Sequence, residues 1–274
     1  MDTLKSYLEE HAAGDLLPWH RQLEASRSFG LTIAETEEAI LAHGLLPARY
    51  QRNRTTIPQA GQRELFHSQV AVVGCGGLGG YVIEELARVG VGRIVAIDPD
   101  VFEEHNLNRQ LLSTPERLGT SKVAAAARRV GEVNPAVTLV PLRRAFSRDN
   151  GGELLAGSRV AVDCLDAVAS RLELAEACSS VGIPLVHGAI AGWYGQLTTQ
   201  FPGEATLQAV YRSRSGGPGV ETSLGNPSFT PAVVASLEVA EACKLLLGQG
   251  TTLRGRQLIV DLKSMEFTVI NLKE

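Results

Sequence analysis

The segment VAVVGCGGLGGYVIEELARVG, residues 70–90, decides the fold class of this chain. Its β-branched start predicts a buried strand, and the glycines that follow open a helical pattern. Gly74, Gly76 and Gly79 occupy the three glycine positions of a G-x-G-x-x-G turn, and Gly77 lies between them. Residues without side chains let backbone N–H groups approach a phosphate, and the start of the next helix favours negative charge. The segment therefore predicts a nucleotide site, whereas tight packing of a strand against a helix is the alternative that needs no ligand.

A polar tail extends this prediction beyond the glycine turn. Asp98 ends a second strand, about twenty residues past the turn, where a carboxylate can accept hydrogen bonds from ribose hydroxyls or cap the next turn. Lys122 opens a long alanine-rich helix, and Arg109 precedes it in a polar loop. Cationic groups that converge on a phosphate turn are suited to neutralising a triphosphate. The other candidates for nucleotide binding in this tail are Asp100, Asn106 and Gln110.

The rest of the chain fits a Rossmann-like α/β fold. Further strands are expected within residues 137–146, 158–163, 183–190 and 195–201, with flanking helices that cover a mostly parallel sheet. Asp163 and Asp166 fall at the carboxyl end of one strand, the edge where ligands collect in an open parallel sheet. Residues 202–227, rich in Gly, Ser and Arg, predict a long, mobile and functional loop. Thr230 is expected to cap the next helix, and residues 254–272 to close the chain as antiparallel strands.

Residues 1–46 are expected to form a small N-terminal helical extension. Apolar residues at three- and four-residue spacing predict helices within residues 2–12, 18–30 and 32–44, and Thr32 with Glu35 forms a capping-box pattern. Pro47 marks a boundary, so residues 47–274 are expected to form the nucleotide-binding domain. The extension could cover a surface or support dimerisation.

Composition and charge exclude several classes of protein. The net charge of −4 and the pI near 5.9 give no reason to expect nucleic acid as a partner, because a protein that binds nucleic acid usually shows a basic footprint. No apolar run is long enough to span a membrane, and the N-terminus lacks the pattern of a signal peptide. The four scattered cysteines predict free buried thiols and a cytoplasmic location: Cys75, Cys164, Cys178 and Cys243.

Six short motifs together resemble a known family. They are RYQRN (49–53), VVGCGGLGG (72–80), IDPDVFEEHNLNRQ (97–110), GTSKV (119–123), DCLD (163–166) and GQLT (195–198). Their order and approximate spacing resemble the MoeB/ThiF/HesA family of ubiquitin-activating-enzyme-like adenylyltransferases. The resemblance covers about residue 49 to the C-terminus, and the N-terminal extension lies outside it.

The resemblance implies a reaction and a substrate class. ATP would adenylate the C-terminal carboxylate of a small β-grasp sulfur carrier of the ThiS/MoaD type, which ends in Gly-Gly, and pyrophosphate would be released. By motif position, the glycine turn would cradle ATP and Asp98 would bind the ribose. The residues that would hold the phosphates are Asn106, Arg109 and Lys122. Residues 47–274 would then be an ATP-binding adenylation domain.

Two more residues take roles by resemblance. Asp166 would bind Mg²⁺, and Arg52 matches an arginine that the family donates in trans, across a homodimer interface, into the partner's site. The residue types also fit this chemistry without the resemblance. A carboxylate that attacks an α-phosphate must overcome repulsion between anions, and Arg109, Lys122, Arg52 and Mg²⁺ would supply positive charge there. Mg²⁺ prefers oxygen ligands and retains waters, so one or two carboxylates suffice.

The chain departs from the family pattern in three ways. Many relatives carry two C-x-x-C pairs that bind zinc, but the corresponding stretches here contain no cysteine, so we expect no zinc site. Residues 202–231 also lack a cysteine, so we expect a released or transferred acyl-adenylate instead of an enzyme-bound thioester. Finally, Ala167 follows Asp166 where the family commonly has asparagine, which would change the surroundings of the metal.

Other functions remain open at this point. A relative could adenylate a small molecule or a tRNA nucleoside, although a basic C-terminal extension suited to RNA is absent from this sequence. The chain could also be a nucleotide-binding module without catalysis, or an NAD-dependent oxidoreductase built on the same turn. NAD binding would need neither Lys122 nor Asp166. The identity of the carrier is not encoded in these motifs.

Overall fold

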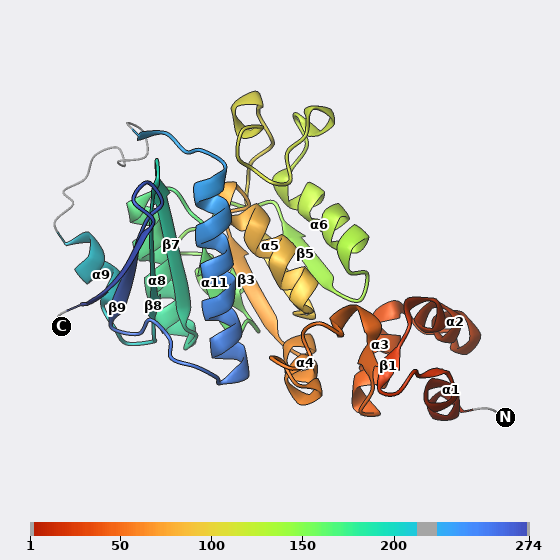
Figure 1. Ribbon diagram of the computed structural model, residues 1–274. Helices are drawn as coiled ribbons and strands as arrows, with labels where there is room; N and C mark the ends of the chain where they lie inside the picture. The colour runs from red at the N-terminus through yellow and green to blue at the C-terminus, as the bar shows by residue number, and fades with distance from the viewer. Residues whose placement is uncertain (1–2, 213–223, 273–274) are drawn as a thin grey trace.

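The computed structural model describes residues 3–212 and 224–272 and confirms the predicted α/β fold class (Figure 1). An eight-stranded sheet lies at its centre, with the strands in the order β10-β9-β8-β7-β6-β3-β4-β5. The neighbours that pair in parallel are β7 (Leu185–Ala191), β6 (Val160–Asp163), β3 (Gln69–Val73), β4 (Arg93–Ile97) and β5 (Thr138–Leu142). Beyond β7 the sheet continues with antiparallel strands: β8 (Tyr194–Gln200), whose direction was not predicted, and the predicted C-terminal pair β9 (Arg256–Asp261) and β10 (Glu266–Asn271).

Helices cover both faces of the sheet, which explains why β3, β4 and β6 are apolar except for one polar residue at an end of each strand. One face is covered by α5 (Gly77–Val89), α6 (Lys122–Val133) and α11 (Phe229–Leu247), as Figure 1 shows. The other face is covered by α7 (Gly151–Leu155), α8 (Val168–Val181) and α9 (Thr206–Tyr211). The short helix α4 (Gln59–Phe66) packs against α11 and leads into β3. The result is a domain of three layers, in which the sheet lies between two layers of helices. Polar residues lie at the ends of the strands.

The segment predicted as a loop, residues 202–227, contains a helix. Leu207 and Tyr211 are both buried and lie four residues apart, on one face of α9. Because this face packs against α8 and β8, tertiary contacts stabilise a helix that the local composition does not indicate. The prediction of an unbroken loop is wrong there. Its middle part, residues 213–223, lies outside the described residues.

The start of α11 also differs from the prediction. The helix begins at Phe229 with Ser228 at the N-cap position. Thr230, which the sequence predicts as the cap, is buried one residue inside the helix, and its hydroxyl donates to the Gly192 carbonyl at 2.6 Å. Thr230 therefore ties α11 to the turn between β7 and β8.

The N-terminal extension contains the three predicted helices, α1 (Leu4–His11), α2 (Trp19–Phe29) and α3 (Ile33–Ala42). The capping box of Thr32 and Glu35 forms as predicted. Two very short strands, β1 (Leu16–Leu17) and β2 (Leu46–Pro47), pair in parallel and were not predicted, because two residues are too few to show a strand pattern. β2 includes Pro47, the predicted boundary between the two domains. The division into two domains stays a prediction. A 3₁₀ turn, η1 (Ala48–Tyr50), follows directly.

The structure bears on two predictions that concern the whole chain, the state of the cysteines and the lack of a membrane-spanning segment. All four cysteines are free thiols, as predicted, but only Cys75 and Cys178 are buried, and Cys164 and Cys243 are partly exposed. Within residues 3–212 and 224–272, no helix combines the length and the apolar character that crossing a membrane requires.

Candidate active site

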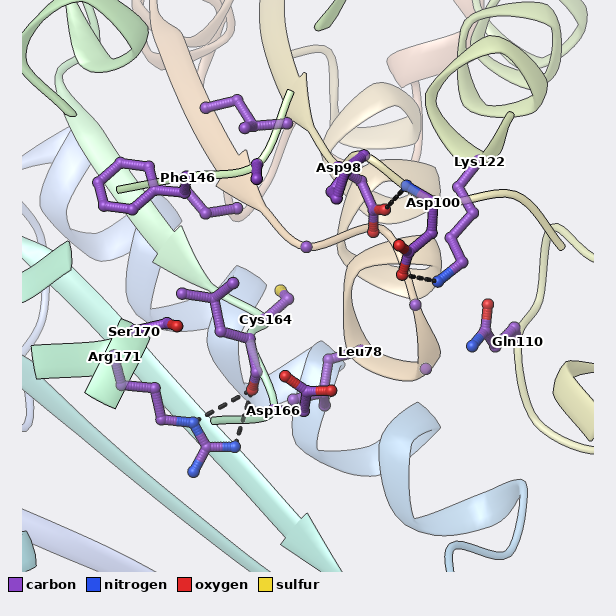
Figure 2. Close-up of a pocket in the computed structure, with 18 of the residues that line it drawn as sticks. Leu78, Asp98, Asp100, Gln110, Lys122, Phe146, Cys164, Asp166, Ser170 and Arg171 are labelled. Carbon is purple, nitrogen blue, oxygen red and sulfur yellow. Dashed lines mark hydrogen bonds and ion pairs between the residues drawn. The ribbon is translucent and has the colours of Figure 1, made fainter. Parts of the chain in front are cut away.

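A pocket of about 300 Å³ opens at the carboxyl ends of β3, β4 and β6 (Figure 2). These strands are neighbours in the sheet, so the segments that follow them meet at one edge. The turn after β3, the tail after β4 and the segment after β6 all line the pocket, together with residues from the start of α6 and from the segment after β5. In Figure 2, Asp98, Asp100 and Lys122 lie on one side of the pocket, and Asp166 and Arg171 on the other.

The glycine turn is packed too tightly for side chains at two positions. Gly74 has a φ of 94°, and a Cβ added to it would lie 2.5 Å from the Cys164 carbonyl oxygen. A Cβ on Gly79 would lie 1.9 Å from the Gly74 carbonyl oxygen. Gly74 and its neighbours Gly76 and Gly77 line the pocket, whereas Gly79 lies beneath the turn and only shapes it. The turn thus exposes backbone to the pocket.

The exposed backbone includes the start of α5. The first hydrogen bond of this helix runs from the Gly80 N–H to the Gly76 carbonyl at 3.1 Å, and no side chain caps the helix. The N–H groups of Gly77 and Leu78 precede that bond, so they have no acceptor within the helix. Both residues line the pocket. An uncapped helix N-terminus of this kind favours a phosphate or another anion.

Asp98 holds the glycine turn in place. Its side chain is buried, with Oδ2 accepting the Cys75 N–H at 2.7 Å and Oδ1 accepting the Asp100 N–H at 2.8 Å. The carboxylate therefore caps the next turn and links it to the loop after β3. Each oxygen has a further lone pair, so the predicted contact with a ribose is compatible with these bonds.

Two cationic side chains reach the pocket from different elements. Lys122 is buried at the start of α6, and its Nζ lies 3.0 Å from Asp100 Oδ2. Arg109 lies against the glycine turn, since a Cβ added to Gly77 would be 3.9 Å from its Nε. The Arg109 guanidinium donates to the His105 carbonyl at 2.9 Å. Lys122 and Arg109 therefore line the same pocket as the start of α5, and their role toward a phosphate stays a prediction.

The two amide residues of the tail have different surroundings. Asn106 is buried outside the pocket lining, and its Oδ1 accepts the Glu103 N–H at 2.9 Å, so it builds the loop that carries Arg109. Gln110 lines the pocket, is buried, and keeps its Oε1 without a hydrogen-bond partner among the described residues. A buried amide oxygen without a partner is expensive unless a ligand or water donates to it. Gln110, the exposed turn and the uncapped helix together fit a nucleotide.

Asp166 lies on a short segment that is fastened from both sides. The preceding peptide, at Leu165, donates its N–H to Asp163 Oδ1 at 3.0 Å. Its carbonyl accepts two hydrogen bonds from Arg171, at 3.1 Å from Nε and 2.8 Å from Nη2 (Figure 2). Asp166 itself is exposed and lines the pocket. The segment can therefore present this carboxylate at a fixed place.

A buried network supports the same segment from below. His187 donates from Nδ1 to Asp163 Oδ2 at 2.7 Å, and burial lowers the pKa of His187, so its ring is neutral. The Tyr211 hydroxyl accepts from Arg171 at 2.7 Å and from Gln196 at 3.1 Å, so its own proton points to His187 Nε2 at 3.0 Å. The network joins the Asp166 segment to α9 and β8.

The sequence did not indicate Arg171, His187 or Tyr211 as part of the site. These residues come from three elements and meet only through the packing of α8, β7 and α9. Phe146, which also lines the pocket, could have been found, because it follows β5 as Asp98 follows β4 at the same edge of the sheet.

The two cysteines near the pocket are Cys75, which is buried, and Cys164, which is partly buried. Burial raises the pKa of the Cys75 and Cys164 thiols well above the ordinary value, so both stay protonated at neutral pH. Cys75 donates its backbone N–H to Asp98, so it takes part in the structure of the glycine turn.

The carboxylates that could bind a metal in the pocket do not form a cluster of ligands. Among residues 3–212 and 224–272, no group of three or more His, Cys, Asp or Glu side chains could hold a metal ion. Asp166 alone fits Mg²⁺ that arrives with a nucleotide, because Mg²⁺ takes its other ligands from phosphates and water. The absence of a zinc site stays a prediction.

Arg52 lies far from the pocket of its own chain. α5 begins at the pocket and has 13 residues, which extend over about 20 Å. At its far end, a Cβ added to Gly90 would lie 2.6 Å from the Tyr50 hydroxyl. Arg52 follows Tyr50 by two residues and is exposed. A role for Arg52 in catalysis therefore requires the pocket of another subunit.

Comparison with known proteins shows which proteins this chain resembles in sequence and in fold. The chain is 38% identical to the SAMP-activating enzyme E1 of Haloferax volcanii over 227 residues, covering 81% of this chain and 84% of that protein. It is 34% identical to the adenylyltransferase and sulfurtransferase MOCS3-1 of Zea mays, over 84% of this chain but only 51% of that one, so it spans about half the length of this relative. The crystal structure of E. coli MccB with ATP matches 82% of this chain and 71% of MccB, at 20% identity and a TM-score of 0.66.

The sheet, the glycine turn and the pocket at the carboxyl edge define a Rossmann-like α/β protein with a nucleotide-type site. The sequence profile of the ThiF family matches residues 50–274. The chain belongs to the ThiF family, as the motifs predicted, and its relatives support an adenylyltransferase.

Proposed function

We propose that this protein uses ATP and Mg²⁺ to adenylate the C-terminal carboxylate of a small ubiquitin-like sulfur carrier that ends in Gly-Gly. The observation that carries the proposal is the meeting of Lys122, Arg109 and the uncapped start of α5 in one pocket. The match to a SAMP-activating enzyme E1 over most of both chains supports the substrate class.

The proposed reaction needs no covalent group from the protein. A carboxylate oxygen of the carrier attacks the α-phosphorus of ATP, and the bond between that phosphorus and the oxygen bridging to the β-phosphate breaks. The bridging oxygen leaves with pyrophosphate, and the carrier becomes a mixed anhydride with AMP. Lys122, Arg109 and the N–H groups of α5 would neutralise the negative charge that gathers on the phosphates.

The remaining pocket residues would orient the nucleotide. Ile97, Phe146 and Leu165 supply apolar lining suited to a nucleobase, and Asp98 would accept from the ribose. Asp166 would hold Mg²⁺, which neutralises phosphate charge when it is bound. Because residues 202–231 contain no cysteine, the acyl-adenylate would be released or passed on directly instead of forming an enzyme-bound thioester.

We further propose that the protein works as a homodimer in the cytoplasm and that Arg52 enters the pocket of the partner subunit. Arg52 is exposed and distant from its own pocket, so a second copy is the arrangement in which it can contact ATP. Free thiols at all four cysteines suit a reducing compartment.

The proposal is tested by exchange of labelled pyrophosphate into ATP. We expect exchange that requires Mg²⁺ and a β-grasp carrier ending in Gly-Gly. Exchange with a free small carboxylate, or adenylation of a tRNA nucleoside, would favour the alternative substrates. Absence of exchange, together with ATP affinity unaltered in Arg109→Ala and Lys122→Ala, would indicate a nucleotide-binding module without this chemistry.

Arg171→Lys tests the support of the Asp166 segment. Lysine cannot reproduce the two hydrogen bonds to the Leu165 carbonyl and the third to Tyr211, so Asp166 should lose its fixed position. We expect the Mg²⁺ concentration for half-maximal exchange to rise about tenfold. Arg128→Lys is the control, since Arg128 is exposed on α6 and pairs only with Glu132 among the described residues. An unchanged Mg²⁺ titration in Arg171→Lys would contradict this role.

A further inference from the structure

One buried polar cluster fastens the N-terminal extension to the rest of the protein. The Arg49 guanidinium donates to Glu37 of α3, to Gln22 Oε1 of α2 at 2.7 Å and to Asn134 Oδ1 at 2.8 Å. The Tyr50 hydroxyl donates to Glu37 Oε1 at 2.8 Å and accepts from Asn134 Nδ2 at 2.7 Å. We refer to these five residues as the Arg49 cluster.

The Arg49 cluster is well placed to fix geometry. Asn134 caps the end of α6 and also donates to the Ala87 carbonyl of α5 at 2.9 Å, so the cluster reaches the two helices that begin at the pocket. Glu37 is completely buried, and a buried carboxylate that loses its cationic partner is strongly destabilising. The Arg49 guanidinium also lies 4.9 Å from the ring centre of Trp19. The extension and η1 are therefore held together as a unit.

The turn that follows η1 is anchored to the extension a second time. Arg54 pairs with Asp15 at 2.8 Å, and the Asn53 N–H donates to the Tyr50 carbonyl at 2.8 Å. Of the three arginines in residues 49–54, two thus point back to the extension. Arg52 stands between them, exposed and without a hydrogen bond or ion pair to any described residue.

We propose that the N-terminal extension is a platform that presents Arg52 to the pocket of a second copy of this chain. Arg49 and Arg54 are its positioning residues: neither lines the pocket of its own chain, the Arg49 cluster contacts α5 and α6 at the ends away from that pocket, and both residues hold the backbone of residues 48–57 that carries Arg52. This inference rests on the proposed function, because it requires Arg52 to act in trans. It also gives the extension, which lies outside the family match of residues 50–274, a defined task in catalysis.

The test uses mixed dimers in which only one complete site exists. One subunit, the donor, carries Lys122→Ala, which disables its own pocket, and keeps Arg52. The other, the acceptor, keeps its pocket but carries Arg52→Ala. Neither homodimer has a complete site, so pyrophosphate exchange reports the heterodimer alone. Arg49→Lys or Arg54→Ala is then added to the donor or, in a matched control, to the acceptor.

We expect position-dependent effects. Arg49→Lys in the donor should lower exchange about tenfold or more, because a displacement of about 1 Å at a catalytic group can lower a rate by a hundredfold. Arg54→Ala, which removes a half-exposed ion pair, should lower it about threefold. The same changes in the acceptor should leave exchange within about twofold. Circular dichroism of each subunit checks folding. If the Arg49→Lys subunit does not fold, the Arg54→Ala subunit alone tests whether the extension positions Arg52.

Each other outcome overturns the inference. Equal losses in donor and acceptor would mean that the cluster only stabilises the fold, and no loss in the donor would mean that Arg52 needs no platform. A mixed dimer without exchange, beside an active wild type, would exclude use of Arg52 in trans and the platform with it. If the wild type itself shows no exchange with any carrier, the proposed function fails instead.

Discussion

Replacing Gly79 with alanine is expected to lower the free energy of unfolding by about 3 kcal/mol and to abolish measurable ATP binding. The added Cβ would lie 1.9 Å from the Gly74 carbonyl oxygen and 2.8 Å from the Gly74 carbonyl carbon. Both contacts are to backbone, so no side chain can rotate away. The turn would have to open, and the N–H groups at the start of α5 would move away from the phosphate position.

Gly131→Ala provides the matched control for this prediction. Gly131 lies in α6, and nothing lies within 4 Å of a Cβ added there. Alanine is the better helix former, so this variant should be more stable by about 0.5–1 kcal/mol. Urea denaturation and ATP titration measure both variants. If the Gly79→Ala protein has the stability and ATP affinity of the wild type, then the turn either has room for a side chain at position 79 or does not bind the phosphates.

Lys122→Ala is expected to lower the rate of pyrophosphate exchange by a factor of about 100 to 1,000. Lys122 is buried at the pocket wall, where a positive charge is screened less than at the surface. If it stabilises the charge that develops on the phosphates, its removal should lower kcat more than it raises the KM for ATP. The fold should survive, because the Asp100 side chain is 62% exposed and can be solvated after its partner is lost.

Two further variants separate charge at this position from charge elsewhere. Lys5→Ala removes an exposed lysine that pairs with Glu9 on α1, and it should leave exchange unchanged. Lys122→Arg keeps the charge and should recover part of the rate. An exchange rate in Lys122→Ala within about threefold of the wild type would exclude Lys122 as a catalytic group.

The parts of the fold that are local in sequence were predictable. The strand, turn and helix from Val70 to Gly90 are specified by composition at each position, and the second strand with Asp98 follows by the same pattern. Because carboxyl ends of neighbouring parallel strands share one edge, the meeting of Asp98, Asp166 and the glycine turn also follows. The family resemblance added roles for Arg109 and Lys122, and both residues line that pocket.

The parts that depend on packing between distant segments were not predictable. α9 forms because Leu207 and Tyr211 pack into the protein interior. The Gly- and Ser-rich sequence around α9 does not indicate this packing. The contact of His187 with Asp163 spans 24 residues, and that of Arg49 with Asn134 spans 85. A histidine or an asparagine alone in a sequence carries no signal of such a partner. These contacts are the ones that hold the predicted site residues in place.

The central claim, transfer of AMP to a carrier carboxylate, is tested most directly by intact-mass measurement of the carrier. A β-grasp carrier ending in Gly-Gly is incubated with the protein, ATP and Mg²⁺, with pyrophosphatase to draw the reaction forward. We predict a carrier species heavier by one AMP group, absent when the carrier lacks its last two glycines and formed far more slowly with the Lys122→Ala protein. An unmodified carrier under conditions in which the protein binds ATP, for every carrier tested, would contradict the claim.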